Sequence, residues 1–168
     1  SEMCIRDRYH MYGVKRILRV GTAGGVADHI HLRDIVLGQA SCTDSNYAAQ
    51  YHLPGTYAPI ASFSLLEAAA QTARELHLPV HVGNLLSTDV FYQESSPLPQ
   101  WAAMGVLATE MESAALYMNA AAAGAEALCI VTVSDCPLRN EFTTAEERQS
   151  TFTDMMQLAL ETVKHIHQ

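Results

Sequence analysis

The sequence has little positive charge. Its 168 residues include ten lysines and arginines against eighteen aspartates and glutamates, which gives a net charge of −8. A nucleic-acid-binding protein needs a basic face for the phosphate backbone, so this balance predicts no nucleic-acid partner. Apolar residues make up 49% of the chain and charged residues 17%. Such a composition excludes an intrinsically disordered chain and suffices for a single domain, residues 1–168, with one sizeable core.

The sequence also lacks the patterns that mark disulfide frameworks, metal sites and secretion. Its four cysteines form no C-x-x-C pair, its eight histidines form no H-E-x-x-H motif, and no N-x-[ST] site or signal-peptide pattern occurs. We therefore expect reduced thiols, no bound metal and a cytoplasmic location. The most apolar stretch, 113–133, carries Asn119, Gly124 and Glu126 and changes midway from a helical to a strand-like pattern. It predicts a buried helix followed by a buried strand, and no membrane span.

Short apolar strands alternate with helical stretches from residue 14 onward. Strands are predicted at 15–20, ending at Gly21, and at 35–40, 80–86 and 128–133. Helices are predicted from a Ser64/Glu67 capping box to His77, over 110–123, and from a Thr144/Glu147 capping box to the end of the chain. The terminal helix has an apolar face of Phe152, Met155, Met156, Leu158, Ala159 and Val163. The alternation predicts an α/β fold with a mixed or parallel sheet.

Polar residues stand where the predicted strands end, which is where α/β sheets tend to bind ligands. Arg19, Thr22 and the amides of a turn beginning at Gly21 could bind an oxyanion. Ser134 and Asp135 follow the most apolar strand, where an acid is a candidate site residue. Each feature also has a plain structural interpretation, namely a tight glycine turn and an aspartate exposed in a loop.

Three further segments carry candidate site residues with equally plain alternatives. Phe91 and Tyr92 could stack on a planar ligand, or they could belong to the core. Glu110 and Glu112 precede an apolar helix, where the helix dipole by itself favours acids. Arg148 lies in the first turn of the last helix, against that dipole preference, so it indicates an acidic partner or ligand unless it is a simple surface arginine.

Taken in order and spacing, these segments resemble the DeoD-type, bacterial purine nucleoside phosphorylases of the nucleoside phosphorylase superfamily. The resemblance runs from Tyr12 to about the C-terminus. It is most specific in residues 132–135 (TVSD), 143–149 (TTAEERQ) and 151–155 (TFTDM). Residues 21–24 (GTAG), 42–45 (CTDS), 82–85 (VGNL), 89–92 (DVFY) and 110–112 (EME) also match. The resemblance implies a three-layer α/β/α fold around a central mixed sheet.

The resemblance also implies a reaction and a role for each candidate residue. Phosphate attacks the anomeric carbon of a purine (deoxy)nucleoside, giving free base and pentose 1-phosphate in purine salvage, with inorganic phosphate as co-substrate and no cofactor or metal. Asp135, assisted by Arg148, would protonate the leaving purine at N7. Burial at the strand end would keep its carboxyl group protonated until the reaction.

The substrate-binding residues are likewise implied by the resemblance. Arg19, Thr22 and Gly21 would bind phosphate. Glu112 would accept hydrogen bonds from the sugar hydroxyls, with Met111 against the sugar and Glu110 beside them. The base would lie against Phe91, with Thr109 and Ser134 nearby. The resemblance further implies a homo-oligomer, in the family a hexamer built as a trimer of dimers.

Two departures from the family pattern leave alternatives open. Residues 23–25 (AGG) are similar to the methylthioadenosine/adenosylhomocysteine nucleosidases, which hydrolyse a similar bond without phosphate, although Arg19 and Arg148 favour the phosphorylase. Uridine phosphorylases are related too, but Ser134-Asp135 indicates a purine. The family's N-terminal Gly-Asp-Pro-type phosphate loop is missing here, so we expect an N-terminally truncated fragment without the early strands. Residues 1–8 resemble a spurious reading-frame end as much as a true surface segment, and an inactive truncated subunit is a third alternative.

Overall fold

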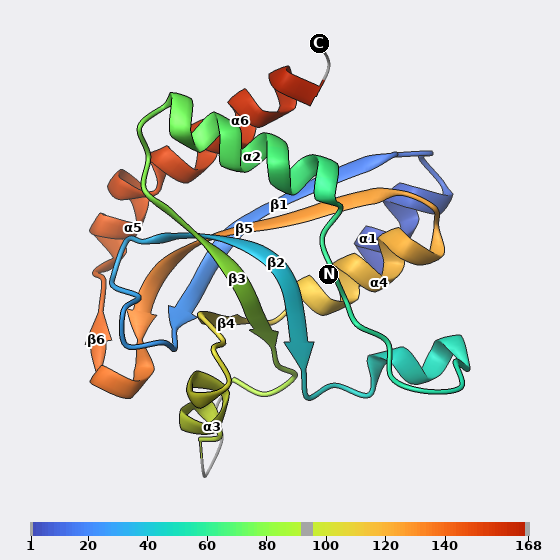
Figure 1. Ribbon diagram of the computed structural model, residues 1–168, viewed down its shortest axis with the longest axis horizontal. Coiled ribbons are helices and arrows are strands. Elements are labelled where there is room, and N and C mark those ends of the chain that lie inside the picture. Colours follow the sequence, from blue (N-terminus) through green and yellow to red (C-terminus); the bar gives the residue numbers. More distant parts are fainter. Residues whose placement is uncertain (1, 92–95, 167–168) are drawn as a thin grey trace.

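The computed structural model describes residues 2–91 and 96–166, in which strands and helices alternate (Figure 1). The strands are β1 (Arg16–Gly25), β2 (Ile35–Thr43), β3 (Val80–Ser87), β4 (Ala108–Glu110), β5 (Glu126–Cys136) and β6 (Glu141–Phe142). The α-helices are α1 (Glu2–His10), α2 (Phe63–Glu75), α3 (Leu98–Ala103), α4 (Ser113–Ala122), α5 (Ala145–Thr151) and α6 (Thr153–Ile166). Short 3-10 turns cover Tyr47–Tyr51 and Pro137–Arg139.

The strands form one mixed sheet that closes on itself. β1 pairs in parallel with β5 and antiparallel with β4, and β4, β3 and β2 follow as parallel neighbours. β2 then pairs antiparallel with β5, which completes the ring, and β6 extends the end of β5. The expected central mixed sheet is confirmed. Its closure brings the end of β1 beside both β4 and β5, and this sets the geometry of the site.

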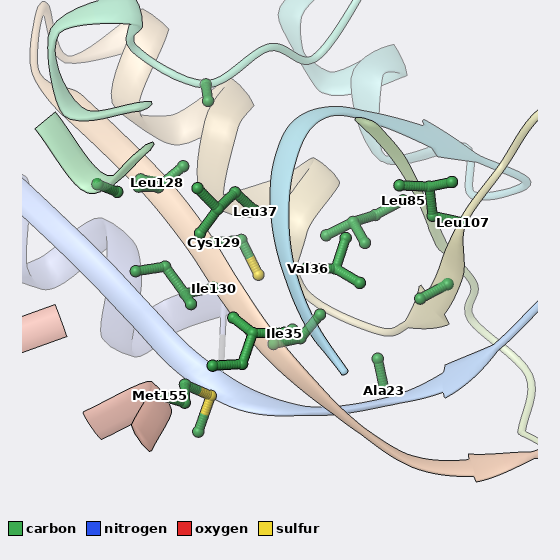
Figure 2. Close-up of a cluster of buried hydrophobic side chains, with 14 of the residues drawn as sticks. Ala23, Ile35, Val36, Leu37, Leu85, Leu107, Leu128, Cys129, Ile130 and Met155 are labelled. Carbon is green, nitrogen blue, oxygen red and sulfur yellow. The ribbon is translucent and has the colours of Figure 1, made fainter. Parts of the chain in front are cut away.

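Helices cover the outside of the ring on two sides (Figure 1). α2 packs with α6 against β1, β2 and β5, and α1 packs with α4 on the other side. β5 is buried along most of its length because its neighbours flank both edges and helices cover it. Figure 2 shows side chains of β2, β5 and α6 gathered in one apolar cluster, among them Leu37, Leu128, Ile130 and Met155.

The hydroxyl group of Tyr117 ties α4 to the sheet. It donates to the Gly38 carbonyl at 2.5 Å and accepts from the Cys129 amide at 3.0 Å. Gly38 and Cys129 are the last pair of the β2–β5 ladder, so the hydroxyl continues the hydrogen bonding where the strands separate. Burial raises the pKa of Tyr117 well above 10, so the group keeps the proton that it donates.

Removing this hydroxyl with Tyr117→Phe is expected to lower the free energy of unfolding by about 1–3 kcal/mol. The substitution leaves a buried carbonyl and a buried amide without their partner. Urea denaturation followed by circular dichroism measures the change. Tyr12→Phe is the matched control, because Tyr12 is 77% exposed. Equal stability of the two variants would contradict the structural role of the Tyr117 hydroxyl.

The N-terminal residues that the structure describes fold into a helix. α1 begins at Glu2, within a stretch that shows no clear periodicity. Ile5 and Tyr9, four residues apart, lie on one face of it and pack against the core. The Tyr9 hydroxyl also approaches the Glu126 carbonyl at 3.4 Å. Packing of this apolar face against the core therefore stabilises the short helix.

Two helix predictions need correction. α2 begins at Phe63 after Ser62, and Ser64 does not cap it, because the Ser64 hydroxyl donates to Glu126 instead. The capping box of Thr144 and Glu147 is confirmed, but the helix that it begins ends at Thr151.

A second helix, α6, follows the break at the buried residue Phe152. Met155, Leu158 and Ala159 are buried as expected, whereas Met156 is 54% exposed and Val163 37% exposed. In the described ranges 2–91 and 96–166, no helix is long and apolar enough to cross a membrane.

Candidate active site

The glycine segment after Arg19 is not the turn that the sequence predicts. β1 continues through it to Gly25 because it pairs with β5 as far as Gly24, which lies opposite Asp135. On its other edge, Gly24 lies opposite Thr109 of β4. Three strands thus meet at one residue. A Cβ atom on Gly24 would lie 3.2 Å from Oδ2 of Asp135, so the absence of a side chain makes room for the carboxylate.

Asp135 lies one residue before the end of β5, beside the buried Ser134. The Ser134 hydroxyl donates to Oδ1 of Asp135 at 2.7 Å, which fixes the orientation of the carboxylate. The Asp135 side chain is half-buried. The sheet therefore holds the Asp135 carboxylate in place while one side of it stays accessible, as is required of a group that donates a proton to a ligand.

Arg148 is linked to the end of β5 through Thr143. Its Nε donates to Oγ1 of Thr143 at 3.3 Å, and its Nη2 donates to the Thr143 carbonyl at 3.1 Å. Thr143 in turn donates from its amide and its hydroxyl to the Ser134 carbonyl, at 2.9 and 2.7 Å. In the described ranges, Arg148 makes no hydrogen bond or ion pair with Asp135. Sequence analysis missed Thr143 as the link, although it opens one of the most specific segments.

Glu110 ends β4, whereas the sequence predicts that it begins the helix. Its carboxylate accepts from the Glu112 amide and the Ser113 amide, both at 2.9 Å, and from the Ser113 hydroxyl. The helix therefore begins at Ser113. The Glu110 side chain is only 1% exposed. Its carboxylate binds the amides at the start of α4, where the helix dipole favours negative charge.

Arg19 lies between the carboxylates of Glu110 and Glu112. Its Nη2 forms an ion pair with Oε2 of Glu112, and its Nη1 lies 3.5 Å from Oε2 of Glu110. The guanidinium group folds over Gly21, where a Cβ atom would lie 3.0 Å from Nη1. The structure thus brings Arg19, Gly21, Glu110 and Glu112 together, as a cation enclosed by two acids.

Cys129 forms the inner wall of this cluster and was not singled out by sequence analysis. Its sulfur accepts from Nη1 of Arg19 at 3.4 Å. Burial, and after it the charge of Glu110, raises the pKa of Cys129 to about 12, so the thiol is neutral. Burial acts to lower the pKa of Arg19, but the hydrogen bond to the Cys129 sulfur and the charges of Glu110 and Glu112 outweigh it, and the net shift is upward. The guanidinium group is therefore charged at any physiological pH.

The other predicted residues lie on β1, in the segment after β3, and on or just after β4. Thr22 is exposed on β1, and Met111 is 40% exposed. Phe91, in the segment after β3, is 72% exposed. This segment begins beside Glu110, because the Thr88 amide donates to the Glu110 carbonyl. The hydroxyl oxygen of Thr109 is buried and has no hydrogen-bond partner in the described part of the chain. Tyr92 lies outside the described residues.

A hollow of about 370 Å³ lies elsewhere, between the start of β1 and the end of α6. It is lined by Val14, Lys15, Arg16, Leu18, Val163 and Ile166. These residues include no carboxylate to act as the acid, so the candidate site is placed at Asp135 and Arg19 and not at this hollow. The described residues hold no group of three or more histidine, cysteine or acidic side chains that could bind a metal ion.

A comparison with protein families shows to which family the chain belongs. A family described as the Phosphorylase superfamily matches residues 6–167. The chain belongs to this superfamily. Within the superfamily, it is similar to proteins named "Purine nucleoside phosphorylase DeoD-type". The protein of Colwellia psychrerythraea is 48% identical over 94% of this chain and 68% of its own length. That of Streptococcus pneumoniae serotype 19F is 49% identical over 90% and 65%.

A solved structure supports the fold of this superfamily member. It is described as a P knowlesi homologue of P falciparum PNP, and it superimposes with a TM-score of 0.80 at 24% identity. The superposition covers 96% of this chain and 65% of the solved one. The phosphorylase-superfamily fold predicted from the sequence is therefore confirmed. The chain spans about two thirds of the length of the curated relatives that it matches.

Proposed function

We propose that this chain catalyses the phosphorolysis of purine (deoxy)nucleosides to free purine and (deoxy)ribose 1-phosphate, as a glycosyltransferase of purine salvage. The similarity to DeoD-type purine nucleoside phosphorylases over at least nine tenths of the chain carries the proposal. The site residues fit this reaction, because it needs an acid for the leaving base and a cation for phosphate. Asp135 stands near the end of β5, and Arg19 of β1 extends its guanidinium group to Glu110 at the end of β4.

In the proposed reaction, an oxygen of phosphate bonds to the anomeric carbon as the bond from that carbon to the purine nitrogen breaks. The electron pair of the broken bond passes to the purine. Asp135 donates a proton to N7, so the base leaves as a neutral molecule. Hydrogen phosphate gives up its own proton when its oxygen is glycosylated, which balances the proton from Asp135. The Ser134 hydroxyl orients the carboxyl group, and Arg148 assists from its anchor on Thr143.

We assign the phosphate to Arg19, with Gly21 and Thr22 of the same strand beside it. A guanidinium group is a charged donor that suits phosphate oxygens, and the Gly21 position leaves room for the guanidinium group. Phosphate held there would lie beside the sugar, which becomes cation-like as the bond to the base breaks, so its negative charge stabilises the transition state. Phosphate is a co-substrate in this proposal, and the reaction needs neither an organic cofactor nor a metal.

We assign the nucleoside to the surface between β4 and the start of α4. Glu112 accepts from the sugar hydroxyls and Met111 packs against the sugar, while Glu110 holds both in place by binding the amides of the helix. Phe91 packs against the base, with Thr109 and Ser134 below it. The exposed ring of Phe91 fits this role, because a planar base can cover it.

The proposal extends to the assembly and location of the protein. We propose that it acts as a homo-oligomer, a hexamer formed as a trimer of dimers, in the cytoplasm. Both the hexameric assembly and the cytoplasmic location are proposed by analogy with the family.

Release of hypoxanthine from inosine tests the function. We expect release from purified protein only when inorganic phosphate is present, and we expect little release of uracil from uridine under the same conditions. Release without phosphate would replace the proposal with a nucleosidase. Failure to release hypoxanthine in either condition, with the fold verified by circular dichroism, would contradict catalysis by this chain.

A further inference from the structure

The two acids around Arg19 give the proposed phosphate site an unfavourable net charge. One guanidinium group faces two carboxylates, Glu110 and Glu112. In the described ranges, the hydrogen bonds and ion pairs of Arg19 go to these two carboxylates and to the neutral thiol of Cys129. A phosphate ion that approached Arg19 in this state would meet negative charge on balance. One carboxylate must therefore move before the anion can bind well.

The two ends of the guanidinium group are held differently. Nη1 contacts Cys129 and Glu110 at 3.4 and 3.5 Å, and both groups are buried. The Glu110 carboxylate is fixed by the amides of Glu112 and Ser113 and is 1% exposed. Nη1 is therefore anchored in the protein interior and is not available for exchange.

Nη2 contacts Glu112, the carboxylate of the two that can move away from Arg19. The Glu112 side chain is 29% exposed, and Arg19 is the partner of its carboxylate in the described part of the chain. Glu112 is also the residue before α4, so rotation of its side chain does not disturb the helix. An anion that takes the place of this carboxylate would obtain the Nη2 donor without altering the buried contacts.

We propose that Glu112 is a switch between the two substrates: in the free protein its carboxylate occupies the phosphate position on Arg19, and nucleoside binding draws it away. The proposal rests on the proposed function, which supplies a sugar whose hydroxyl groups donate to Glu112. A neutral nucleoside gives the carboxylate new donors, and phosphate then takes its place on Arg19. Each substrate must strengthen the binding of the other by the same factor, because such coupling is reciprocal.

Titration calorimetry with inorganic phosphate tests the switch, with and without a C-nucleoside purine analogue that cannot be cleaved. For the unaltered protein, we expect the analogue to tighten phosphate binding by about 5- to 150-fold, the usual range of coupling between two sites. Glu112→Gln keeps the shape of the side chain and removes its charge. This variant should bind phosphate alone at least about fivefold more tightly than the unaltered protein, and the analogue should add little.

Two further variants separate the switch from other effects. Glu126→Gln is the matched control, because it removes an acid that is paired with another arginine of β1, Arg16, outside the site. It should leave phosphate binding unchanged. Glu112→Asp keeps the charge but shortens the side chain, so it should weaken the ion pair and give an intermediate phosphate affinity.

The outcomes distinguish the switch from the function on which it rests. Phosphate binding that is equally tight in the unaltered protein and in Glu112→Gln would overturn the switch while leaving the phosphate site in place. Coupling that survives in Glu112→Gln would also overturn it. If neither protein binds phosphate, even with the analogue, then the phosphorylase proposal itself fails.

Discussion

Replacing Asp135 by asparagine is expected to lower the kcat of inosine phosphorolysis by about 10²- to 10⁴-fold, the range that general acid catalysis supplies. Asparagine has the same shape and can still accept the hydrogen bond from Ser134, but it has no proton to give to the departing purine. The base would then have to leave as an anion. The expected loss therefore lies in the chemical step, and the binding of inosine should change much less.

A substrate with a methyl group already on N7 separates proton donation from other effects of the variant. Its base carries a positive charge and needs no proton in order to leave. Asp135→Asn should therefore retain most of its activity on N7-methylguanosine while losing it on inosine. Asp154→Asn is the matched control, because Asp154 is exposed in the first turn of α6. An equal loss on both substrates would show that Asp135 acts otherwise than as the acid.

Sequence analysis found the main elements because their local signals are strong. The apolar run 128–133 predicts β5, and the Thr144/Glu147 capping box predicts the start of α5, as the structure has them. It placed β1 too short because glycines usually end strands, whereas here parallel pairing with β5 extends the strand to Gly25. That pairing joins residues more than 100 positions apart, and no local pattern contains it.

The candidate site shows the same limit. Asp135 and Arg19 can be singled out from the sequence, since polar residues at the ends of apolar strands are conspicuous. Their neighbours depend on closure of the sheet. Gly24 meets both Asp135 and Thr109 only because β1 pairs on both of its edges. Cys129 looked like one more apolar residue of a buried strand, although its sulfur contacts Arg19.

Glu110 illustrates how one local pattern can serve two purposes. Two acids before an apolar helix are favoured by the helix dipole and are equally suited to binding a ligand. The structure divides the two purposes between them. Glu110 is buried and binds the first amides of α4, whereas Glu112 is partly exposed and paired with Arg19. The distinction depends on which side chain faces the sheet, and β4 sets this by pairing with β3 up to Glu110.

Arg19→Ala is expected to reduce kcat/KM for phosphate by about 10- to 150-fold, which corresponds to the 1.5–3 kcal/mol of a hydrogen bond to a charged group. The KM for inosine should change far less, because the proposed nucleoside contacts come from residues outside β1. The variant also leaves Glu110 and Glu112 without their cation, so some loss of stability is expected. Initial rates at varied phosphate and at varied inosine separate the two effects.

Two variants sharpen this test of the phosphate site. Arg16→Ala is the matched control, because Arg16 lies on the same strand three residues earlier and is paired with Glu126 at 2.5 Å, away from the site. It should leave both KM values unchanged. Arg19→Lys keeps the charge and should recover part of the phosphate affinity, but not all, because an ammonium group lacks the fork that lets Nη1 contact Cys129 and Glu110 while Nη2 binds phosphate. If Arg19→Ala raised the KM of inosine as much as that of phosphate, Arg19 would be a general support of the site and the phosphate would bind elsewhere.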